Sequence, residues 1–304
     1  MVIRNQTASR SALSTITERP KATRPEENAG WRSTPAGGRL QTIILTRNMN
    51  SILALNDVRS LAPAAFTAAP AADLTQRYAH VTTADVLLRL QADGWGITAA
   101  RQGRSHSEHA VHEVRLGHPD FAANGEYRVE LVLENSSDGS GALRFLAGIA
   151  RFICLNGLLV GDRVADVVAI HRGKVREQAL ELAGAIRGRF ADVAGVVERW
   201  KEIRLDEERS RSFAAEALKL RWPGREPKAD LGDVLQVRRN EDSGESLWHV
   251  YNRTQEAVTR GGFKVRFTEA GASGRISGAR RLGSIRRDVG LNRLLWNLAE
   301  TYAN

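Results

Sequence analysis

The feature that most constrains this chain is a run of strand-like patterns that begins at residue 127. Apolar residues alternate with Arg and Glu over 127–134, which is the period-two pattern of a β-strand with one solvated face. The sequence NSSDGSG follows at 135–141, and Asp138-Gly139 supplies a left-handed turn position at little steric cost. A second apolar run over 143–154 completes a predicted hairpin.

More strand signals follow this hairpin. Asn156-Gly157 marks another reversal, and strand-like character resumes over 158–160 and 164–170. The turn-forming chemistry of these reversals predicts structural roles rather than catalytic ones. The predicted structural turn residues are Asn135, Asp138, Gly139, Asn156 and Gly157.

The hydrophobic period changes to a helical one after Gly173. One continuous apolar stripe is formed by Val175, Ala179, Leu182, Ile186, Phe190, Val193, Val197, Trp200 and Ile203. Such a stripe predicts one long helix over 174–203 with a single buried face. The order strand, strand, strand, long helix predicts an α+β fold with a curved antiparallel sheet and additional C-terminal helices.

Other elements are expected on both sides of this core. Helices are predicted after the capping sequence at 82–85, and at 212–222, 233–239, 245–260 and 283–302. Strands of the same sheet are predicted at 97–102 and 112–116. The Gly- and Arg-rich stretch at 263–283 is predicted to be mobile, and Trp248 and Trp296 are interpreted as core residues.

Composition divides the chain into three parts. Residues 1–50 are rich in Ser, Thr, Arg, Pro and Gly, and their few apolar side chains predict a disordered basic tail. The Ala- and Pro-rich segment at 51–73 is interpreted as a linker. Residues 74–304 are expected to form a single α+β domain, with its core at 127–205 and a helical part at 212–304.

The charge balance is the main compositional clue to function. Lys and Arg total 44 against 35 Asp and Glu, which gives a formal net charge of +9. This excess favours a polyanionic partner, with nucleic acid as the first candidate. The alternative is that an arginine-rich proteome raises the charge without any binding role.

The sequence also bears on compartment. Cys154 is the only cysteine, so an internal disulfide is excluded, and its apolar strand favours a small buried hydrophobe over a nucleophile. Apolar runs stay shorter than the roughly 18 residues of a membrane helix. The N-terminal region carries Arg4, Arg10 and Arg19 without the apolar core of a secretory signal. We expect a cytoplasmic location and no membrane partner.

Motifs for cofactors and metals are missing from the sequence. There is no phosphate-cradling P-loop, no dinucleotide-binding glycine motif after a strand, and no HExxH. The spacing of four histidines does not place them on one helical face as metal ligands, so we interpret them as surface residues. These are His106, His109, His112 and His118. No cofactor, metal site or catalytic residue is expected.

One pattern keeps a nuclease alternative open. Pro119-Asp120 followed by Glu126-Tyr127-Arg128 is faintly similar to the PD…(D/E)xK nuclease motif. Arg stands in place of the catalytic Lys, and the interval is very short. Two carboxylates at this place would have to hold Mg²⁺ through their oxygens.

The placement of cations supports the nucleic-acid interpretation. Arg144 and Arg151 on the second strand, beside Phe145 and Phe152, are candidates for phosphate contacts with base stacking. These two arginines are seven residues apart and face opposite sides of a regular strand, so one of them is open to internal pairing with Glu130 or Glu134. The other nucleic-acid-binding candidates are Arg172, Lys174, Arg176, Arg280, Arg281, Arg286 and Arg287.

Four blocks of sequence carry a family resemblance in their order along the chain. They read RYAHVTTADVLLRLQADGW, NSSDGSGALRFLAGIARFICLNGLLVGD, LWHVYNRTQEAVTRGG and IRRDVGLNRLLWNLAE. Together they resemble the phage- and plasmid-associated domain-of-unknown-function 932 family from about Leu74 to Asn304. Ser137 stands where that family usually has His, so chemistry that depends on the histidine is not expected here.

The expected order of elements is similar to that of the recombination-mediator single-strand annealing proteins, which is an analogy of topology alone. The phage or plasmid context that the resemblance implies fits such a role. We therefore expect a non-enzymatic protein that binds and anneals single-stranded DNA as a ring or other homo-oligomer. Two alternatives stay open: a mobile-element protein that blocks a host defence factor, and a metal-dependent nuclease.

Overall fold

The computed structural model describes one of the two compact units into which the chain divides. These units are Met1–Leu45 and Thr46–Asn304. The described residues are 52–121, 126–151, 157–159, 166–169, 171, 181 and 183–304. The predicted basic tail at 1–50 and the buried position predicted for Cys154 lie outside them.

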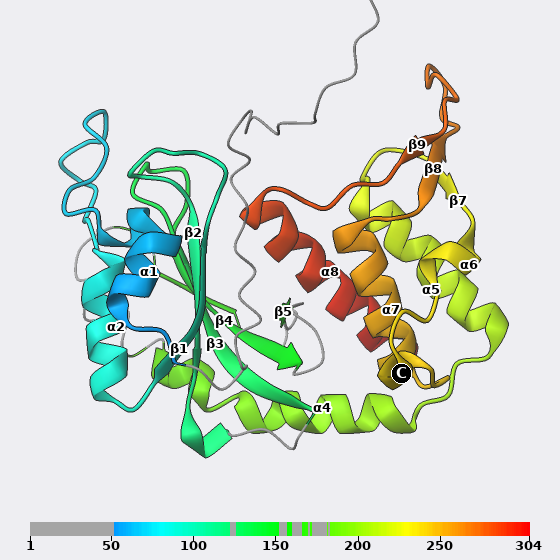
Figure 1. Ribbon diagram of the computed structural model, residues 1–304, viewed down its shortest axis with the longest axis horizontal. Helices are drawn as coiled ribbons and strands as arrows, with labels where there is room; N and C mark the ends of the chain where they lie inside the picture. The colour runs from blue at the N-terminus through cyan, green and yellow to red at the C-terminus, as the bar shows by residue number, and fades with distance from the viewer. Residues whose placement is uncertain are drawn as a thin grey trace, which may run out of the picture. The chain divides into compact units, whose positions relative to one another are not determined.

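An antiparallel sheet forms the centre of this unit (Figure 1). Its strands are β1 Gly96–Gln102, β2 His112–Gly117, β3 Tyr127–Asn135, β4 Leu143–Arg151, β5 Gly157–Leu159 and β6 Asp166–Ala169. The order is β1-β2-β3-β4-β5, and β6 also pairs with β4. The antiparallel sheet and the helices that follow it confirm the predicted α+β class.

Helices precede and follow the sheet. They are α1 Leu55–Leu61, α2 Thr83–Ala92, α4 Phe190–Glu202, α5 Glu207–Arg221, α6 Leu231–Val234, α7 Leu247–Arg260 and α8 Ile285–Ala303. The short 3-10 turns are η1 Pro63–Phe66, η2 Pro119–Phe121 and η3 Asn240–Asp242. Among the described residues, no helix combines the length and apolarity that a membrane crossing needs.

The predicted hairpin is present as β3 and β4. Their register runs from the pair Tyr127↔Arg151 to the pair Glu134↔Arg144. Both later strands use β4 as their partner, because β5 pairs with the stretch at 148–150 and β6 with the stretch at 143–146. Since β4 is bordered on both sides over most of its length, it lies in the interior of the sheet.

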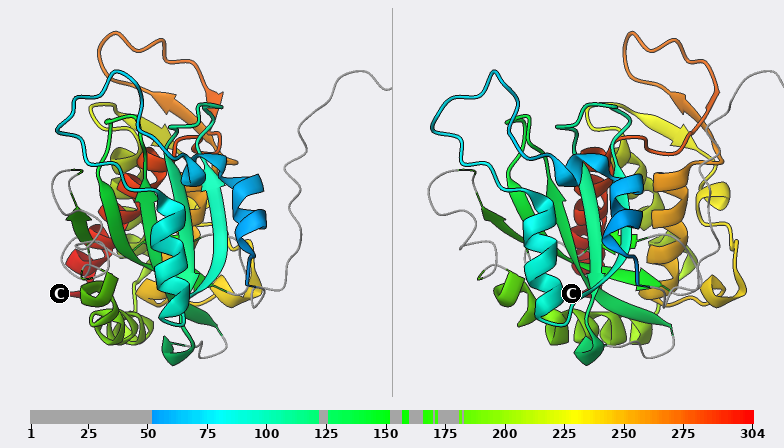
Figure 2. Two further views of the ribbon diagram at one scale, coloured as in Figure 1. Left: turned by 90° about the vertical axis from the view of Figure 1, so that its left-hand side faces the viewer. Right: turned by 60° about the vertical axis from the view of Figure 1, so that its left-hand side comes forward.

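The two faces of β3 and β4 differ in chemistry. Leu131 and Phe145 point into the apolar core with α2 and α4. The opposite face carries Val132 among charged residues and was predicted to be solvated. That prediction is wrong, because α8 covers this face and packs Ile285 and Val289 against Val132 (Figures 1 and 2). Charges on this face are therefore buried and need partners within the protein.

The predicted long helix is interrupted within its apolar stripe. Residues 183–187 are helical, a turn follows at 188–189, and α4 begins at Phe190. Gly188 lies in this turn, and glycine weakens a helix interior. The stripe itself is correct, since Ile186, Phe190, Val193, Val197 and Trp200 are all buried.

The C-terminal helices share an aromatic core. The Trp200 ring lies 4.3 Å from the Trp296 ring and 5.3 Å from the Tyr251 ring, so α4, α7 and α8 meet at one place. Trp248 stacks on Tyr251 with ring centroids 6.1 Å apart. Trp248 and Trp296 are both buried, which confirms their interpretation as core residues.

A second, three-stranded sheet takes up two parts of the stretch at 263–283 that was predicted to be mobile. Its strands are β7 Pro227–Ala229, β8 Lys264–Phe267 and β9 Ser277–Gly278, in that order. The reason is local packing, because Val265 is buried and the Phe267 ring lies 5.5 Å from the Trp222 ring. The predicted helix at 233–239 is instead the single turn α6.

The segment interpreted as a linker is part of the folded unit. Its described part holds α1 and η1, and Leu53, Val58 and Ala65 are buried. The Leu53 amide donates a 2.7 Å hydrogen bond to the Ile97 carbonyl at the start of β1. The composition misled because small alanines pack closely in a short turn, although they form no long apolar stripe.

Candidate functional site

The turn between β3 and β4 is the centre of the candidate site. Asp138 Oδ1 accepts a 2.9 Å hydrogen bond from the Ser140 amide, as in an Asx-turn. Gly139 adopts a φ of 73°, a conformation that strains L side chains. A Cβ on Gly139 would lie 2.5 Å from Leu74 Cδ2. The turn therefore requires glycine here for two independent reasons.

A buried row of polar side chains supports this turn. Asn135 Nδ2 donates to Thr83 Oγ1 at 3.0 Å, and Asn135 Oδ1 lies 3.0 Å from His171 Nε2. Thr83 Oγ1 lies 2.8 Å from His112 Nε2. The surface position predicted for His112 is wrong, since β2 buries the ring fully and burial lowers its pKa to about 4. The row fixes the base of the hairpin turn to the start of α2.

Arg286 connects the first turn of α8 to the hairpin turn. Its Nη2 donates hydrogen bonds of 3.1 Å to Ser136 Oγ and 2.7 Å to Ser140 Oγ. A Cβ on Gly141 would lie 2.6 Å from the same nitrogen, so this glycine leaves room for the guanidinium. Arg286 therefore links α8 to the hairpin turn through one nitrogen of its guanidinium group.

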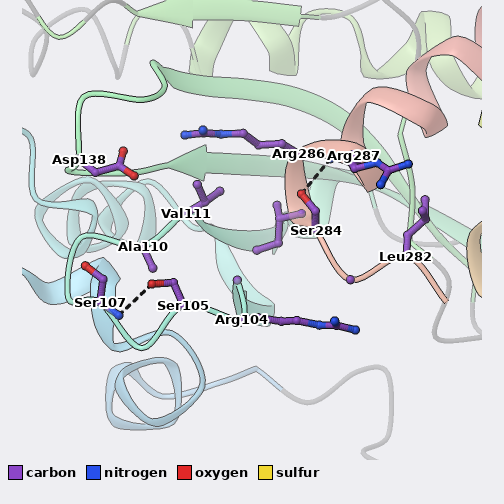
Figure 3. Close-up of a pocket in the computed structure, with 13 residues that line it drawn as sticks. Arg104, Ser105, Ser107, Ala110, Val111, Asp138, Leu282, Ser284, Arg286 and Arg287 are labelled. Carbon is purple, nitrogen blue, oxygen red and sulfur yellow. Dashed lines mark hydrogen bonds between the residues drawn. The ribbon is translucent and has the colours of Figure 1, made fainter. Parts of the chain in front are cut away.

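A cavity of about 510 Å³ lies beside this connection. Its walls are the loop between β1 and β2, Asp138 of the hairpin turn, and residues 282–287 (Figure 3). Val111, Leu282 and Ile285 contribute apolar surface. Cavities of this size hold small ligands or parts of larger ones. Three sequence segments that are distant along the chain thus form one concave site.

Two arginines at this cavity are free of internal partners, and we call Arg104 and Arg287 the pocket arginines. Both are exposed, and neither has a carboxylate within ion-pair distance in the described part of the chain. A Cβ on Gly283 would lie 2.5 Å from Arg104 Cζ, so the guanidinium rests directly on the backbone before α8. Burial, and then the charge of Arg287, lower the pKa of Arg221 to about 10.

The segment before α8 adds two more exposed cations, Arg280 and Arg281. Its path is fixed by backbone hydrogen bonds, from the Gly262 amide to the Ala279 carbonyl at 3.0 Å and from the Leu282 amide to the Thr259 carbonyl at 2.9 Å. Backbone approach at Gly261 is so close that a Cβ there would lie 2.2 Å from the Ala279 oxygen. These cations therefore lie on a rigid path into the pocket.

The arginines on the sheet behave differently, and we call Arg101, Arg115 and Arg128 the sheet arginines. Arg101 and Arg115 both bind Glu113, at 2.6 Å and 3.0 Å. Arg128 binds Glu130 at 2.7 Å. Although burial opposes ionisation, Arg115 and Arg101 hold the pKa of Glu113 below its usual range. This network neutralises itself beneath α8.

The two arginines predicted on the second strand have different surroundings. Arg144 is half-buried and lies directly opposite Glu134 in the β3–β4 register. Arg151 is only 1% exposed, with Nη1 2.7 Å from Asp242 Oδ1. Its proposed phosphate contact is therefore a misassignment, because the partner carboxylate comes from η3, far along the chain. Neither residue belongs to the pocket.

The carboxylates of the nuclease pattern both form ion pairs. Asp120 forms an ion pair with Arg187, and Glu126 binds Lys201 at 2.8 Å, so the carboxylates of the nuclease pattern are occupied by cations. The described residues contain no group of three metal-ligating side chains. The predicted set Arg172, Lys174, Arg176 and Asn156 lies outside the described residues, and Gly157 begins β5 opposite Ala150.

Arg104 is an exposed cation of the site that the sequence did not predict. Arg104 lies in a polar loop between two strands, and its sequence neighbours are serines and histidines. Only the fold brings that loop against the start of α8. The available signal was the Arg104-Ser105 pair in a loop whose stretch 103–109 has no hydrophobic residue, which is typical of a binding loop but not specific.

Comparison with known proteins places the chain in a family. The family model described as "Domain of unknown function (DUF932)" matches residues 72–296. The chain therefore belongs to the DUF932 family. The hairpin turn, the pocket and the start of α8 all lie inside the matched region.

Two curated relatives come from Escherichia coli strain K12. The chain is 31% identical to the UPF0380 protein YafZ over 230 residues, which is 74% of this chain and 82% of that protein. It is also 31% identical to the UPF0380 protein YfjQ over 231 residues, covering 75% of this chain and 83% of that protein. No solved structure matches the chain.

Proposed function

We propose that this protein binds single-stranded DNA through its backbone phosphates, with the pocket as the principal contact. The observation that carries the proposal is the contrast among its arginines. The pocket arginines are exposed and unpaired at a concave site, whereas the sheet arginines are all engaged by carboxylates. Asp138 is the one carboxylate in the cavity lining, and it forms no ion pair with either pocket arginine within the described part of the chain. Clustered cations short of counter-charges are electrostatically unfavourable, and a bound polyanion relieves that repulsion.

The chemistry of the pocket suits a phosphate. A guanidinium offers two parallel N–H donors to two phosphate oxygens. Arg287 also lies in the first turn of α8, where the helix dipole is positive and favours anions. Ser105 and Ser107 add hydroxyl groups on the opposite wall of the cavity. Cationic and hydroxyl donors therefore converge from two sides.

The shape of the pocket favours a flexible strand over a duplex. A cavity of about 510 Å³ admits one phosphate with part of its sugar or base. A rigid duplex carries its phosphates on a broad convex surface, whereas a single strand can bend one phosphate inward. The apolar surface of Val111, Leu282 and Ile285 offers contact area to a sugar or base edge.

The proposal extends from binding single-stranded DNA to annealing it. With its phosphates held and no base-reading groups required, a bound strand keeps its bases available for pairing, which is what annealing needs. The proposal includes homo-oligomerisation, cytoplasmic action without a cofactor, and service to a phage or plasmid. Its support is the cation arrangement together with the order of sheet and helices.

A binding series with labelled single- and double-stranded oligonucleotides, with and without Mg²⁺, tests the proposal. We expect the parent protein to bind single strands more tightly than duplex and to leave both uncut. The double variant Arg104→Gln/Arg287→Gln should bind single strands about a hundredfold more weakly, at about 1.5 kcal/mol for each of two lost charged hydrogen bonds.

The control is Arg199→Gln/Arg211→Gln, which removes the same charge from exposed positions on α4 and α5. It should bind nearly as well as the parent. The proposal is wrong if the parent binds no single strand at low salt and micromolar concentration. Cleavage that depends on Mg²⁺ would instead support a nuclease.

A further inference from the structure

The small sheet β7–β8–β9 has two faces with different surroundings. Val265 and Phe267 face the helices, where Phe267 lies against Trp222. The opposite face is exposed and carries Lys228, Lys264 and Arg266. We call this outer face with its three cations the basic ribbon.

The register of the basic ribbon places like charges side by side. Lys228 in β7 lies directly opposite Arg266 in β8. Lys264 comes two residues before Arg266 in β8 and therefore lies on the same face. Cross-strand pairs of like charge destabilise a sheet. Where the structure describes the chain, no carboxylate is within ion-pair distance of these three side chains, and the nearby Glu269 is taken by Arg225. The fold thus tolerates an uncompensated local repulsion.

Space around the basic ribbon is open. Gly278 lies opposite Lys264, and a Cβ added at Gly278 would meet nothing within 4 Å. Ile276, just before β9, is 61% exposed and follows the exposed Arg275. An extended anionic chain can therefore approach the backbone here, and an apolar side chain is available next to the cations.

The segment that follows the basic ribbon in the chain leads directly to the pocket. After β9 the backbone passes Arg280 and Arg281 and enters α8 at the pocket (Figure 1). Exposed cations thus occur at the ribbon, along the connecting segment and at the pocket. A single-stranded nucleic acid carries its charges at regular intervals and can follow such a path, whereas a compact anion fills one site only.

From this arrangement we infer that the basic ribbon is a second DNA contact, which holds the backbone of the same strand whose phosphate occupies the pocket. The inference rests on the proposed function and adds a direction to it, from the pocket past the connecting segment to the ribbon. In this binding mode Lys228 of β7 and Arg266 of β8 contact the phosphates of one DNA strand from two neighbouring protein strands. The ribbon therefore lengthens the binding site instead of forming a separate one.

A length series of oligothymidylates tests this inference, with chains of about 4 and about 16 nucleotides, the range of single-strand site sizes. The parent should bind the long chain much more tightly than the short one. The triple variant Lys228→Gln/Lys264→Gln/Arg266→Gln should bind the short chain as the parent does and lose most of the gain with length. Its log–log salt slope on the long chain should be shallower by about 2, at about 0.7 for each phosphate contact.

A second variant separates a loss of DNA binding from a loss of folding. Lys228→Glu places a carboxylate opposite Arg266, so it should raise the thermal midpoint while it lowers affinity for the long chain. The matched control is Arg199→Gln/Arg211→Gln/Lys219→Gln, whose cations are exposed on α4 and α5. This control should keep most of the gain with length.

The outcomes separate the two proposals. If the parent binds neither chain, the proposed function itself fails. If the parent binds both chains and the triple variant keeps the full gain with length, the pocket survives and the basic ribbon is excluded as a contact. If the control triple loses as much as the ribbon triple, net charge explains the effect and the inference is also wrong.

Discussion

The sheet arginines and the pocket arginines have the same chemistry in opposite surroundings. Arg101, Arg115 and Arg128 each lie within ion-pair distance of a buried carboxylate beneath α8. Arg104 and Arg287 are exposed at a cavity and have no such partner in the described residues. The difference teaches that the neighbouring carboxylates, rather than the residue type, separate arginines that stabilise the fold from arginines available to a ligand.

The two groups also differ in what a mutation should change. Removing one partner of a buried pair leaves an uncompensated charge in a poorly hydrated place, which is strongly destabilising. Removing an exposed, unpaired cation leaves no buried carboxylate without its counter-charge. Variants of the first kind should therefore act on folding, and variants of the second kind on binding. The predictions below test this division, starting with the largest effect on stability.

Glu113→Gln should cause the largest loss of stability, about 3 kcal/mol. Glu113 is 2% exposed and bonded to both Arg101 and Arg115, so the change leaves Arg101 with Asp288 alone and Arg115 with Glu130 alone, at 3.5 Å. Urea unfolding at neutral pH measures the effect. The pocket lies outside this network, so DNA affinity per folded molecule should stay within twofold of the parent. An unchanged urea midpoint would contradict the role assigned to the sheet arginines.

Gly139→Val should destabilise by about 1–3 kcal/mol, because the hairpin turn has a positive φ at this position and a Cβ would collide with Leu74. The matched control is Gly224→Val, where φ is 74° and a Cβ would meet nothing within 4 Å. Thermal unfolding of both variants separates backbone strain from the collision. Equal losses for the two variants would show that the contact with Leu74 is unimportant.

Glu134→Gln should act in the opposite direction to Glu113→Gln, although the two glutamates are direct neighbours in the β2–β3 register. Burial raises the pKa of Glu134, so the folded protein holds the proton more tightly than the unfolded chain. That stabilisation is complete below the ordinary Glu pKa of about 4.3 and is lost as pH rises through the raised value.

The glutamine variant carries no titrating group at this position. It should therefore be more stable than the parent at neutral pH, and the advantage should shrink as pH falls toward about 4. Urea unfolding of both proteins across this pH range is the measurement. A Glu134→Gln variant that is less stable than the parent at neutral pH would show that an ionised Glu134 is paired and stabilising.

The smallest effect on stability belongs to the pocket. Arg104→Gln/Arg287→Gln should change the free energy of unfolding by less than about 0.5 kcal/mol, as surface substitutions away from partners usually do. A small gain is compatible with this expectation, since Arg287 adds to the unfavourable environment of Arg221. A loss above about 2 kcal/mol would reassign these arginines to the structural group.

The local patterns of the sequence predicted much of the fold. The alternation from Tyr127 to Glu134 predicted the hairpin because period-two burial depends only on one strand. The apolar stripe through Phe190 and Trp200 predicted the helix face for the same reason. The segment at 52–66 was misread because its burial depends on contacts with β1, which no local pattern shows.

The site was less accessible to prediction, because it depends on pairing over long distances. Arg151 was misassigned since its partner, Asp242, lies 91 residues further along the chain. Arg104 was missed since its loop meets Gly283 only in the folded protein. Arg287 was proposed from charge alone, and the same argument included Arg286, which instead binds two serines of the hairpin turn. Charge patterns identify cations but do not show which of them have partners.

The central claim is that the unpaired pocket arginines bind phosphates. The most direct test is the salt dependence of affinity for one oligothymidylate, measured for the parent, Arg104→Gln/Arg287→Gln and Arg199→Gln/Arg211→Gln. The account predicts a log–log slope shallower by about 1.4 for the pocket variant, which is about 0.7 for each of two phosphate contacts, and a nearly unchanged slope for the control. A pocket variant with the slope and affinity of the parent would contradict the account.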